Sequence, residues 1–259
     1  MPDRPAMPPP GAVVTGGAGG IGLAVAQRLA AGGYEVLALD SRRPALDLAA
    51  QSAEPADRPG KLEFSQVDVR DTAVLVGAVG AGMRAMERPA LLCACAGIKP
   101  PVDIATVDPG TWDDVFAVNV RGAFYAAQAA LPYLAAARGS IVFIGSASAH
   151  GDFENPLYGA SKAALTALAR SLAQTLLGAG VRVNVVTPGF TRTGMAATLS
   201  EERLAAAAQR NVAGRVNEGG DVAAAVAWLA GPEAATVSGA LLDVGSAFGI
   251  PARFGPVTT

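Results

Sequence analysis

The amino-acid sequence predicts an α/β fold: a doubly wound parallel sheet of about seven strands with helices on both faces. Three observations predict it. Short β-like runs alternate with helical runs along the whole chain. The short runs are continuously apolar rather than alternating, as expected of strands that are covered on both faces. A glycine-rich turn, "TGGAGGIG", joins the first strand to the first helix.

The predicted elements follow one another in the order that this fold requires. We expect strands over residues 12–15, 34–40, 61–69, 90–97, 140–146, 181–189 and 239–245. Helical patterns occupy residues 20–33, 71–86, 111–137, 156–178 and 221–231, and the stretch before the last of these is looser. No linker interrupts residues 11–250, which predicts one domain. The proline-rich residues 1–10 read as a disordered lead-in, and residues 251–259 as a tail.

The composition excludes several classes of protein. A net charge of −2 with 16% charged residues does not suggest a nucleic-acid surface or binding to an anionic membrane. No apolar run approaches the length of a membrane-spanning helix, and "MPDRPAMPPP" lacks a signal-peptide core. The two cysteines, Cys93 and Cys95, read as reduced core thiols of a cytoplasmic protein. One histidine and no cysteine pair of metal-binding spacing predict no metal site.

The glycine turn predicts a Rossmann-type dinucleotide site. Gly16, Gly20 and Gly22 would let the backbone approach a pyrophosphate at a helix N-terminus. Asp40 ends the next strand, where an acid can bind the adenosine ribose hydroxyls. Asp68 ends the third predicted strand, where a carboxylate could face the adenine. The alternatives are a packing role for the glycines, a helix-cap or turn role for Asp40, and a helix N-cap near Asp71 for Asp68.

A tyrosine and a lysine lie one helical turn apart in "NPLYGASKAAL". Asn155 and Pro156 predict the start of a helix, so Tyr158 and Lys162 share one face. An ammonium about 4 Å from the phenol would favour the phenolate by about 4 kcal/mol at an effective dielectric constant of about 20. That is about three pKa units, enough for acid–base work near neutral pH. A surface pair without function is the alternative.

Five motifs in register carry a family resemblance. "TGGAGGIG", "NVRG", "SIVFIGSAS", "YGASK" and "TPGFTRT" occur in this order and at suitable spacings. Together they resemble the short-chain dehydrogenase/reductase family, the variety with subunits of about 250 residues, over residues 11–245. The resemblance implies that Tyr158 is the acid/base and that Lys162 lowers its pKa and binds the nicotinamide ribose. It implies that Ser146 holds the substrate oxygen and that Asn119 holds a water that relays protons.

The same resemblance, together with the glycine turn, implies the residues at the cofactor. They are Gly16, Gly20, Ile21, Gly22, Asp40, Asp68, Val69, Cys95, Ala96, Gly97, Tyr158, Lys162, Pro188, Gly189, Thr191 and Thr193. The chain departs from the family in three places. The fourth strand ends in Ala-Cys-Ala-Gly instead of Asn-Asn-Ala-Gly, and "DVGSAFG" replaces Asp-Gly-Gly at the last strand. The gap between serine and tyrosine is one residue short, which leaves Ser148 as the alternative to Ser146.

The sequence favours NAD over NADP. Asp40 would repel a 2′-phosphate and pair with a 2′-hydroxyl, whereas Arg42 and Arg43 act in the opposite direction. The alternatives are a 3-oxoacyl-carrier-protein-type reductase that uses NADP, and a non-catalytic nucleotide-binding regulator of the same fold. The intact quartet of Asn119, Ser146, Tyr158 and Lys162 argues against the regulator.

The residues expected around the substrate pocket indicate a partly apolar secondary alcohol or ketone as the substrate. Candidate pocket residues are Phe153, Phe190, Met195, Leu199, Glu154, His150 and Arg192. Among them His150 reads as a rim or surface residue rather than a catalyst. Small residues on the helices over 111–137 and 156–178 allow close packing of helices. By resemblance these helices form a subunit interface, which implies a homotetramer, with a dimer as the alternative.

Overall fold

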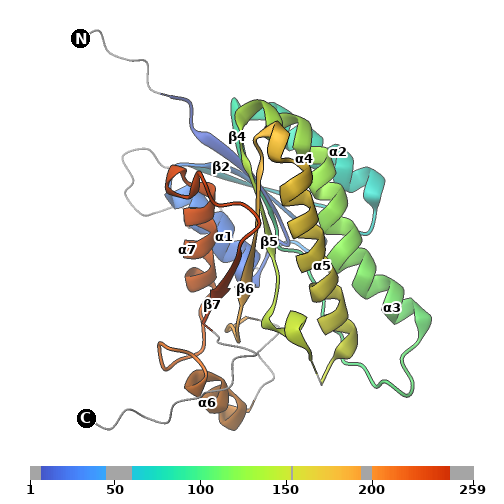
Figure 1. Cartoon of the computed structure of the whole chain (residues 1–259). Helices are drawn as coiled ribbons and strands as arrows, with labels where there is room; N and C mark the ends of the chain where they lie inside the picture. The colour runs from blue at the N-terminus through green and yellow to red at the C-terminus, as the bar shows by residue number, and fades with distance from the viewer. Residues whose placement is uncertain (1–6, 45–59, 153, 194–199, 246–259) are drawn as a thin grey trace, which may run out of the picture.

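Seven parallel strands lie at the centre of the computed structural model, which describes residues 7–44, 60–152, 154–193 and 200–245 (Figure 1). They lie in the order β3-β2-β1-β4-β5-β6-β7, and every neighbouring pair is parallel. The bounds are β1 Pro10–Thr15, β2 Glu35–Asp40, β3 Lys61–Gln66, β4 Arg88–Ala94, β5 Ser140–Ile144, β6 Arg182–Pro188 and β7 Leu241–Val244. The predicted fold class is confirmed.

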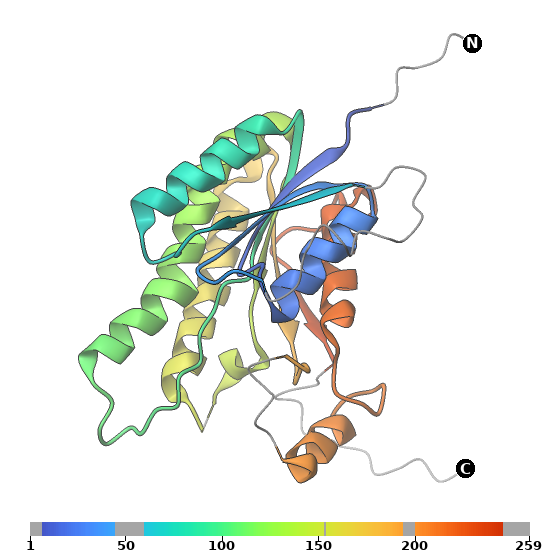
Figure 2. The same cartoon turned by 180° about the vertical axis from the view of Figure 1, so that it is seen from behind.

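Helices cover both faces of the sheet (Figures 1 and 2). One face carries α1 and α7, which pack against each other, and the other face carries α2, α4 and α5. The bounds are α1 Gly20–Ala31, α2 Thr72–Ala85, α3 Pro109–Phe116, α4 Ala123–Ala137, α5 Pro156–Thr175, α6 Glu201–Gln209 and α7 Gly219–Ala230. None of the helices in the described part of the chain is long and apolar enough to cross a bilayer.

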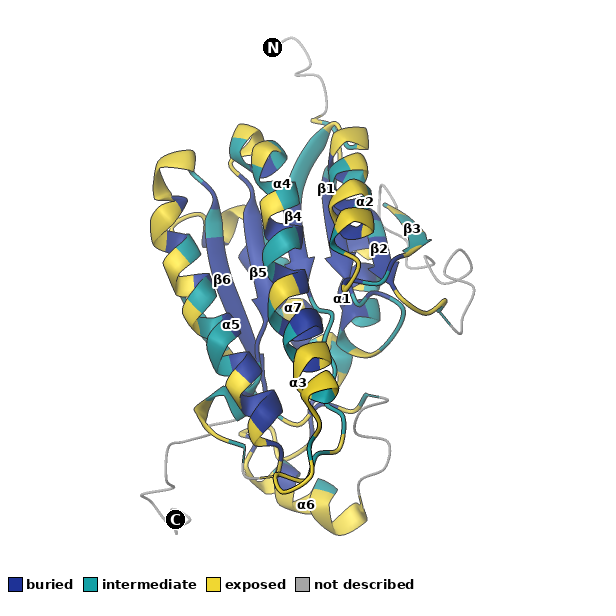
Figure 3. Ribbon diagram, turned by 90° about the vertical axis from the view of Figure 1, so that its right-hand side faces the viewer, coloured by how far each residue is buried: buried dark blue, intermediate teal, exposed yellow. Residues whose placement is uncertain are grey.

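The core has two halves because successive strand residues point to opposite faces of the sheet. In β1, Ala12 and Val14 pack with α1 and α7, whereas Val13 packs with α2 and α4. Burial of each Val or Leu side chain contributes about 1.5–3 kcal/mol to folding. Figure 3 shows the inner strands β5 and β6 as almost fully buried, and β4 is buried over its last four residues. β3 is half exposed, so its alternating pattern is that of an edge strand rather than the continuous apolar run expected.

The structure differs from the sequence prediction mainly at element boundaries. β3 ends at Gln66, three residues before the predicted end, and β5 ends at Ile144. A π-helical turn, η2 at Ala117–Gly122, separates α3 from α4 where one continuous helix was expected. The looser stretch contains a helix, α6, with Ser200 as its N-cap. Of the predicted terminal segments, β1 already begins at Pro10, while residues 1–6 and 251–259 lie outside the described residues.

The chain order of the strands fixes where ligands can bind. β1 pairs with β2 on one side and with β4 on the other, so the connections turn in opposite directions from this point. In open parallel sheets, such a switch point leaves a crevice outside the carboxyl ends of the strands. The segments that follow β1, β4, β5 and β6 therefore meet at one edge of the sheet.

Candidate active site

The glycine turn after β1 forms a close-packed cradle. Gly16 has φ +70°, and a Cβ on it would lie 2.8 Å from the Ala96 backbone. A Cβ on Gly22 would collide with the carbonyl oxygen of Gly16. Gly19 is the N-cap of α1, which has no side-chain cap and no acid in its first turn. The first amides of α1 are therefore suited to an external anion, as the sequence predicts.

Asp40 joins the end of β2 to the glycine turn. Its Oδ2 accepts a hydrogen bond from the Ala18 amide at 3.1 Å, and its Oδ1 accepts one from the Arg42 amide at 3.0 Å. The carboxylate is buried, whereas the Arg42 side chain is 83% exposed and lies 4.0 Å away. A carboxylate has about four acceptor positions, so Asp40 keeps acceptors for ribose hydroxyls after binding both amides.

The segment after β4 is held by a residue that the sequence analysis did not single out. The Thr15 hydroxyl, at the end of β1, accepts hydrogen bonds from the amides of Cys95 and Ala96 at 3.2 and 3.3 Å. Thr15 thus supports the turn in which this chain has Cys95 instead of an asparagine. Burial raises the pKa of the Cys95 thiol to about 12, so the group is neutral. Both Cys93 and Cys95 are free cysteines.

Asn119 also holds the turn after β4, through hydrogen bonds to Ile98. It lies fully buried in the π-helical turn. Its Oδ1 accepts from the Ile98 amide at 2.8 Å, and its Nδ2 donates to the Ile98 carbonyl and to Ser161 Oγ, each at 3.0 Å. The side chain is thus committed to protein partners. A Cβ on Gly97 would lie 3.5 Å from both Asn119 Oδ1 and Lys162 Nζ, which places Gly97 between the two.

The two candidate serines have different partners. Ser146 follows β5, caps the 3-10 helix η3 at Ala147–His150 and forms a hydrogen bond with Tyr158. Ser148 instead donates to the Asp152 carboxylate at 2.8 Å. The geometry therefore brings Ser146, and not its alternative Ser148, to the tyrosine.

Tyr158 and Lys162 project from the first turns of α5 into the buried site. Asn155 caps this helix, since its Oδ1 accepts from the Tyr158 amide at 2.9 Å, with Pro156 in the first turn as predicted. Lys162 Nζ lies 5.8 Å from the centre of the Tyr158 ring and donates to the Ile144 carbonyl at 2.8 Å. Both side chains are buried.

The pKa of Tyr158 shifts in the direction opposite to the one expected. Burial raises the pKa of the phenol, and the hydrogen bond with Ser146 only partly opposes the shift. Burial also lowers the pKa of Lys162 to about 8. The expected net lowering of the tyrosine pKa does not occur in this structure. The reason is that burial penalises both charged forms, and the ammonium binds a backbone carbonyl.

The segment after β6 completes the edge. The Gly189 amide donates to the Val244 carbonyl at 2.9 Å, and Thr191 Oγ1 donates to the Gly189 carbonyl at 3.0 Å. A Cβ on Gly20 would lie 3.4 Å from Thr193, so this segment reaches the glycine turn. Buried Asn217, which the sequence analysis missed, donates from Nδ2 to the Val244 carbonyl at 2.7 Å and pairs through its backbone with Phe190 and Arg192.

Asp68 and Val69 lie beyond the end of β3, not within it as expected. Hydrogen bonds from Arg70 lower the pKa of Asp68, and Arg70 also contacts Asp114. Val69 is buried against Gly122 of the π-helical turn. Asp71, and not Asp68, caps α2. The Asp68 carboxylate is thus already paired, and the feature in this segment that packs toward the site is Val69.

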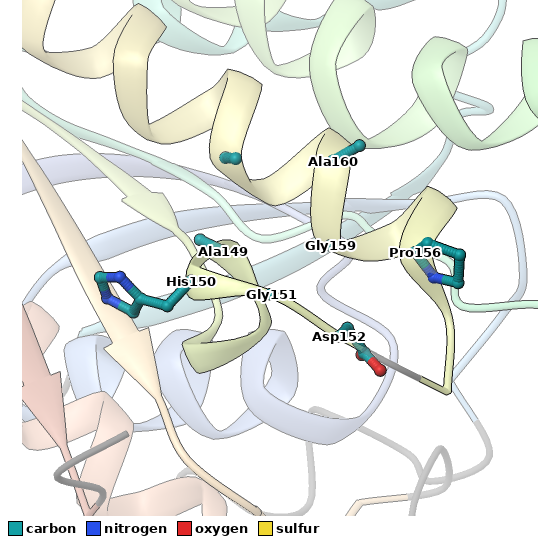
Figure 4. A pocket seen from close by; sticks show the side chains of 8 residues that line it. Ala149, His150, Gly151, Asp152, Pro156, Gly159 and Ala160 are labelled. Carbon is teal, nitrogen blue, oxygen red and sulfur yellow. The ribbon is translucent and has the colours of Figure 1, made fainter. Parts of the chain in front are cut away.

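The predicted substrate-pocket residues are dispersed. Arg192 pairs with Glu218 at 3.1 Å, and Glu154 pairs with Arg203 of α6. Exposed His150 lines an open cavity of about 310 Å³ between η3 and α5, which neither Tyr158 nor Lys162 lines. Figure 4 shows its imidazole pointing away from Asp152. The predicted residues Phe153, Met195 and Leu199 lie outside the described residues.

Comparison with models of known families identifies the family of this chain. The family model described as short chain dehydrogenase matches residues 11–204, which is most of the chain. The chain belongs to the short-chain dehydrogenase family. It is accordingly an oxidoreductase acting on CH–OH groups, from a family that uses nicotinamide cofactors. No cluster of three metal-ligating side chains occurs in the part of this short-chain dehydrogenase that the structure describes.

Individual relatives of this short-chain dehydrogenase have different substrates. It is 36% identical to galactitol 2-dehydrogenase (L-tagatose-forming) of Cereibacter sphaeroides, over 90% of this chain and 92% of the relative. It is 32% identical to a 3-oxoacyl-[acyl-carrier-protein] reductase of Thermotoga maritima, over 90% and 94%. The ligand-free aldohexose dehydrogenase of Thermoplasma acidophilum has a similar structure, with a TM-score of 0.82 at 25% identity and 97% coverage of both chains.

Proposed function

We propose that this enzyme is an NAD(H)-dependent oxidoreductase that interconverts a secondary alcohol and a ketone, with Tyr158 as the general acid/base. The observation that carries the proposal is the convergence of Ser146, Tyr158 and Lys162 at the carboxyl end of β5, beside the switch point of the sheet. A hydrogen-bonded serine, a buried phenol and a buried ammonium form a site that can bind and protonate a carbonyl oxygen.

The glycine cradle fits a nicotinamide dinucleotide. A Cβ on Gly16 or Gly22 would close the space against the backbone, and the α1 N-terminus offers uncapped amides to a pyrophosphate. Asp40 would bind the adenosine ribose, Gly97 and Lys162 the nicotinamide ribose, and residues 188–193 the carboxamide. When bound, the cofactor supplies the hydride. The chain positions the substrate and handles the proton.

Each side chain of the site then has one task. Because burial raises the pKa of Tyr158, the phenol stays protonated at neutral pH, which is the form that donates to a carbonyl oxygen. Ser146 would donate to the same oxygen as negative charge develops on it. Lys162, with a pKa of about 8, can exchange a proton near neutral pH. Asn119 holds the turn that carries Gly97, which keeps the ribose position beside Lys162.

A second candidate is a 3-oxoacyl-carrier-protein-type reductase that uses NADP(H). One observation favours it: the Arg42 side chain is 83% exposed beside Asp40, where its guanidinium could bind a 2′-phosphate. We favour NAD because Asp40 is fixed by two amides while Arg42 is free to move away. The sugar and sugar-alcohol dehydrogenases among the relatives support a polyol or cyclic alcohol as substrate. The two free thiols fit a reducing, cytoplasmic compartment.

The test is turnover on a panel of secondary alcohols and polyols with NAD and NADP. We expect activity with NAD, and we expect Tyr158→Phe to keep NADH binding while it loses nearly all turnover. The ring remains in this variant, but the transferable proton does not. A variant that keeps more than about a tenth of the wild-type rate, a loss of only about 1.4 kcal/mol, would exclude Tyr158 as the acid. A wild-type enzyme that binds NADH and turns over nothing would favour the regulator.

A further inference from the structure

A partly buried ion pair lies beside the tyrosine. Lys99, in the segment after β4, donates from Nζ to Asp152 Oδ2 at 2.7 Å. The Asp152 side chain is 8% exposed and the Lys99 side chain 29% exposed. The Lys99 ammonium also lies over the Tyr158 ring, 5.1 Å from its centre, which is closer than Lys162. Neither residue belongs to the motifs that the proposed function uses.

Asp152 is the centre of a hydrogen-bond network. Besides Lys99, it accepts hydrogen bonds from Ser148 Oγ at 2.8 Å and from the amides of Glu154 and Asn155 at 3.1 and 3.0 Å. A Cβ on Gly159 would lie 3.2 Å from Asp152 Cβ, so the loop rests directly on α5. A carboxylate with four protein donors is held in one position.

This network fixes both segments that flank Tyr158. The Asn155 backbone amide donates to Asp152, its Oδ1 accepts from the Tyr158 amide, and its Nδ2 donates to the Pro100 carbonyl at 2.6 Å. Pro100 follows Lys99 in the chain. The ion pair and the Asn155–Pro100 bond therefore tie the segment after β4 to the first turn of α5 at two adjacent points.

The pair also balances charge at the phenol. Burial is the largest cause of the raised pKa of Tyr158, and the negative charge of Asp152 raises it further. The Lys99 ammonium, bound to that carboxylate, opposes the effect. The other polar or titratable groups around the phenol are Ser146, the neutral Cys95 thiol and Lys162. Exposed His150 lines, together with Asp152, the cavity between η3 and α5, which Tyr158 does not line. Asp152 is thus the one carboxylate of the described residues that raises this pKa.

We propose that Lys99 and Asp152 form a positioning pair for Tyr158, in which Lys99 neutralises the carboxylate and holds the segment after β4 against the start of α5. The proposal rests on the proposed role of Tyr158 and extends it to two residues outside the motifs. Lys99 acts through Asp152 and through its position over the ring. It is a positioning residue and transfers no proton.

The first experiment measures the ionisation of Tyr158 without any turnover. The ultraviolet absorbance of phenolate is followed with pH in the full chain, and the Tyr158→Phe trace is subtracted to remove the other tyrosines. Lys99→Met, which keeps the apolar stem, should raise the midpoint by about one pH unit, and Asp152→Asn should lower it by a similar amount. The double variant should return toward the wild-type midpoint, and Lys99→Arg should stay near it. An unchanged midpoint in Lys99→Met and in Asp152→Asn would overturn the proposal.

The second experiment separates this proposal from the proposed function. Alcohol oxidation needs the deprotonated phenol, so the rising limb of kcat/KM with pH should move in the same direction as the midpoint, with about a tenfold loss for Lys99→Met below it. A shifted midpoint without a shifted limb would leave the pair intact and exclude Tyr158 as the base. A uniform loss at every pH in Lys99→Met, not rescued by arginine, would show a merely structural role and overturn the pair.

Discussion

Lys162 is a buried ammonium, and its burial has a measurable effect on stability. Its pKa falls from an ordinary 10.5 to about 8, so between these values the unfolded chain binds more protons than the folded one. The free energy of unfolding must therefore rise with pH from about 8 to 10.5, and this gain is absent below pH 8. Since the side chain is buried, the full change is about 3 kcal/mol.

The prediction is that Lys162→Met abolishes this rise. The free energy of unfolding, measured with urea from about pH 7 to 10.5, should increase with pH in wild type relative to the variant. The slope of the unfolding free energy against pH is the test. Lys162→Met also leaves the Ile144 carbonyl without its hydrogen bond, but this loss of stability does not depend on pH. Lys61→Met, at an exposed lysine, is the control and should keep the wild-type slope. Parallel curves for wild type and Lys162→Met would show that the lysine is not neutralised by burial.

Asp40 is the residue that should select the cofactor. Each charge-assisted hydrogen bond from the ribose is worth about 1.5–3 kcal/mol, and the same carboxylate repels a 2′-phosphate. We expect wild type to prefer NAD at least a hundredfold in kcat/KM, about 2.7 kcal/mol.

Asp40→Ala should weaken NAD and, with Arg42 beside it, admit NADP. Kinetics with both cofactors in both proteins measure this, and Arg42→Ala serves as the matched variant that should only strengthen the NAD preference. A wild-type preference for NADP would mean that Arg42, and not Asp40, determines which cofactor binds.

At the scale of elements, the turn from β1 to α1 offers a comparison between two neighbouring glycines. A Cβ on Gly22 would collide with the Gly16 carbonyl, whereas a Cβ on Gly19 meets nothing within 4 Å. Gly22→Ala should therefore lower the unfolding free energy by about 1–3 kcal/mol, the usual cost of forcing an extra carbon into a packed site. Gly19→Ala, with φ −168°, should stay within about 0.5 kcal/mol of wild type. Urea unfolding of both variants measures the difference, and equal losses would contradict the cradle geometry.

The elements could be predicted because their causes are local. Continuous apolar runs identify inner strands such as β5, and the Asn155–Pro156 cap places the start of α5 at the predicted residue. The interruption of the predicted helix at η2 could not be predicted. The Asn119 side chain in this turn bonds to the backbone of Ile98, and such bonds between distant segments leave no local pattern in the sequence. α6 has a weak pattern, with few buried side chains, so its helical period was not recognised.

The site could be predicted only as far as the family motifs reach. Ser146, Tyr158 and Lys162 lie together as the motifs imply, and the cradle glycines approach the backbone as the turn requires. Thr15 and the Lys99–Asp152 pair were missed. No short pattern links Lys99 to Asp152, since only the parallel order of β4 and β5 brings their segments together. The tyrosine pKa was misjudged because burial does not show in an i, i+4 spacing.

At the scale of the whole molecule, large apolar side chains remain exposed on α3 and on the segment before it. Trp112 of α3 is 50% exposed and stacks on Phe116, with ring centres 4.8 Å apart, and Ile104 is 78% exposed. The family resemblance and these side chains support a homotetramer through α3–α4 and α5, with a dimer as the alternative.

Sedimentation at micromolar concentration should therefore give a tetramer, and Trp112→Glu should shift it toward smaller species. Trp228→Glu on α7, a tryptophan of similar exposure on the opposite face of the sheet, is the matched variant. A monomeric wild type would refute the assembly.

The dependence of the segment after β6 on β7 has a consequence for biosynthesis. Gly189 and Asn217 both bond to the Val244 carbonyl, and β7 leaves the ribosome after every other element described. A nascent chain that has emerged only to Ala240 already contains the glycine cradle and the tyrosine, but this segment lacks its anchor. The order of synthesis therefore leaves the segment after β6, to which the proposed function assigns the nicotinamide, as the last part of the crevice to gain its anchor.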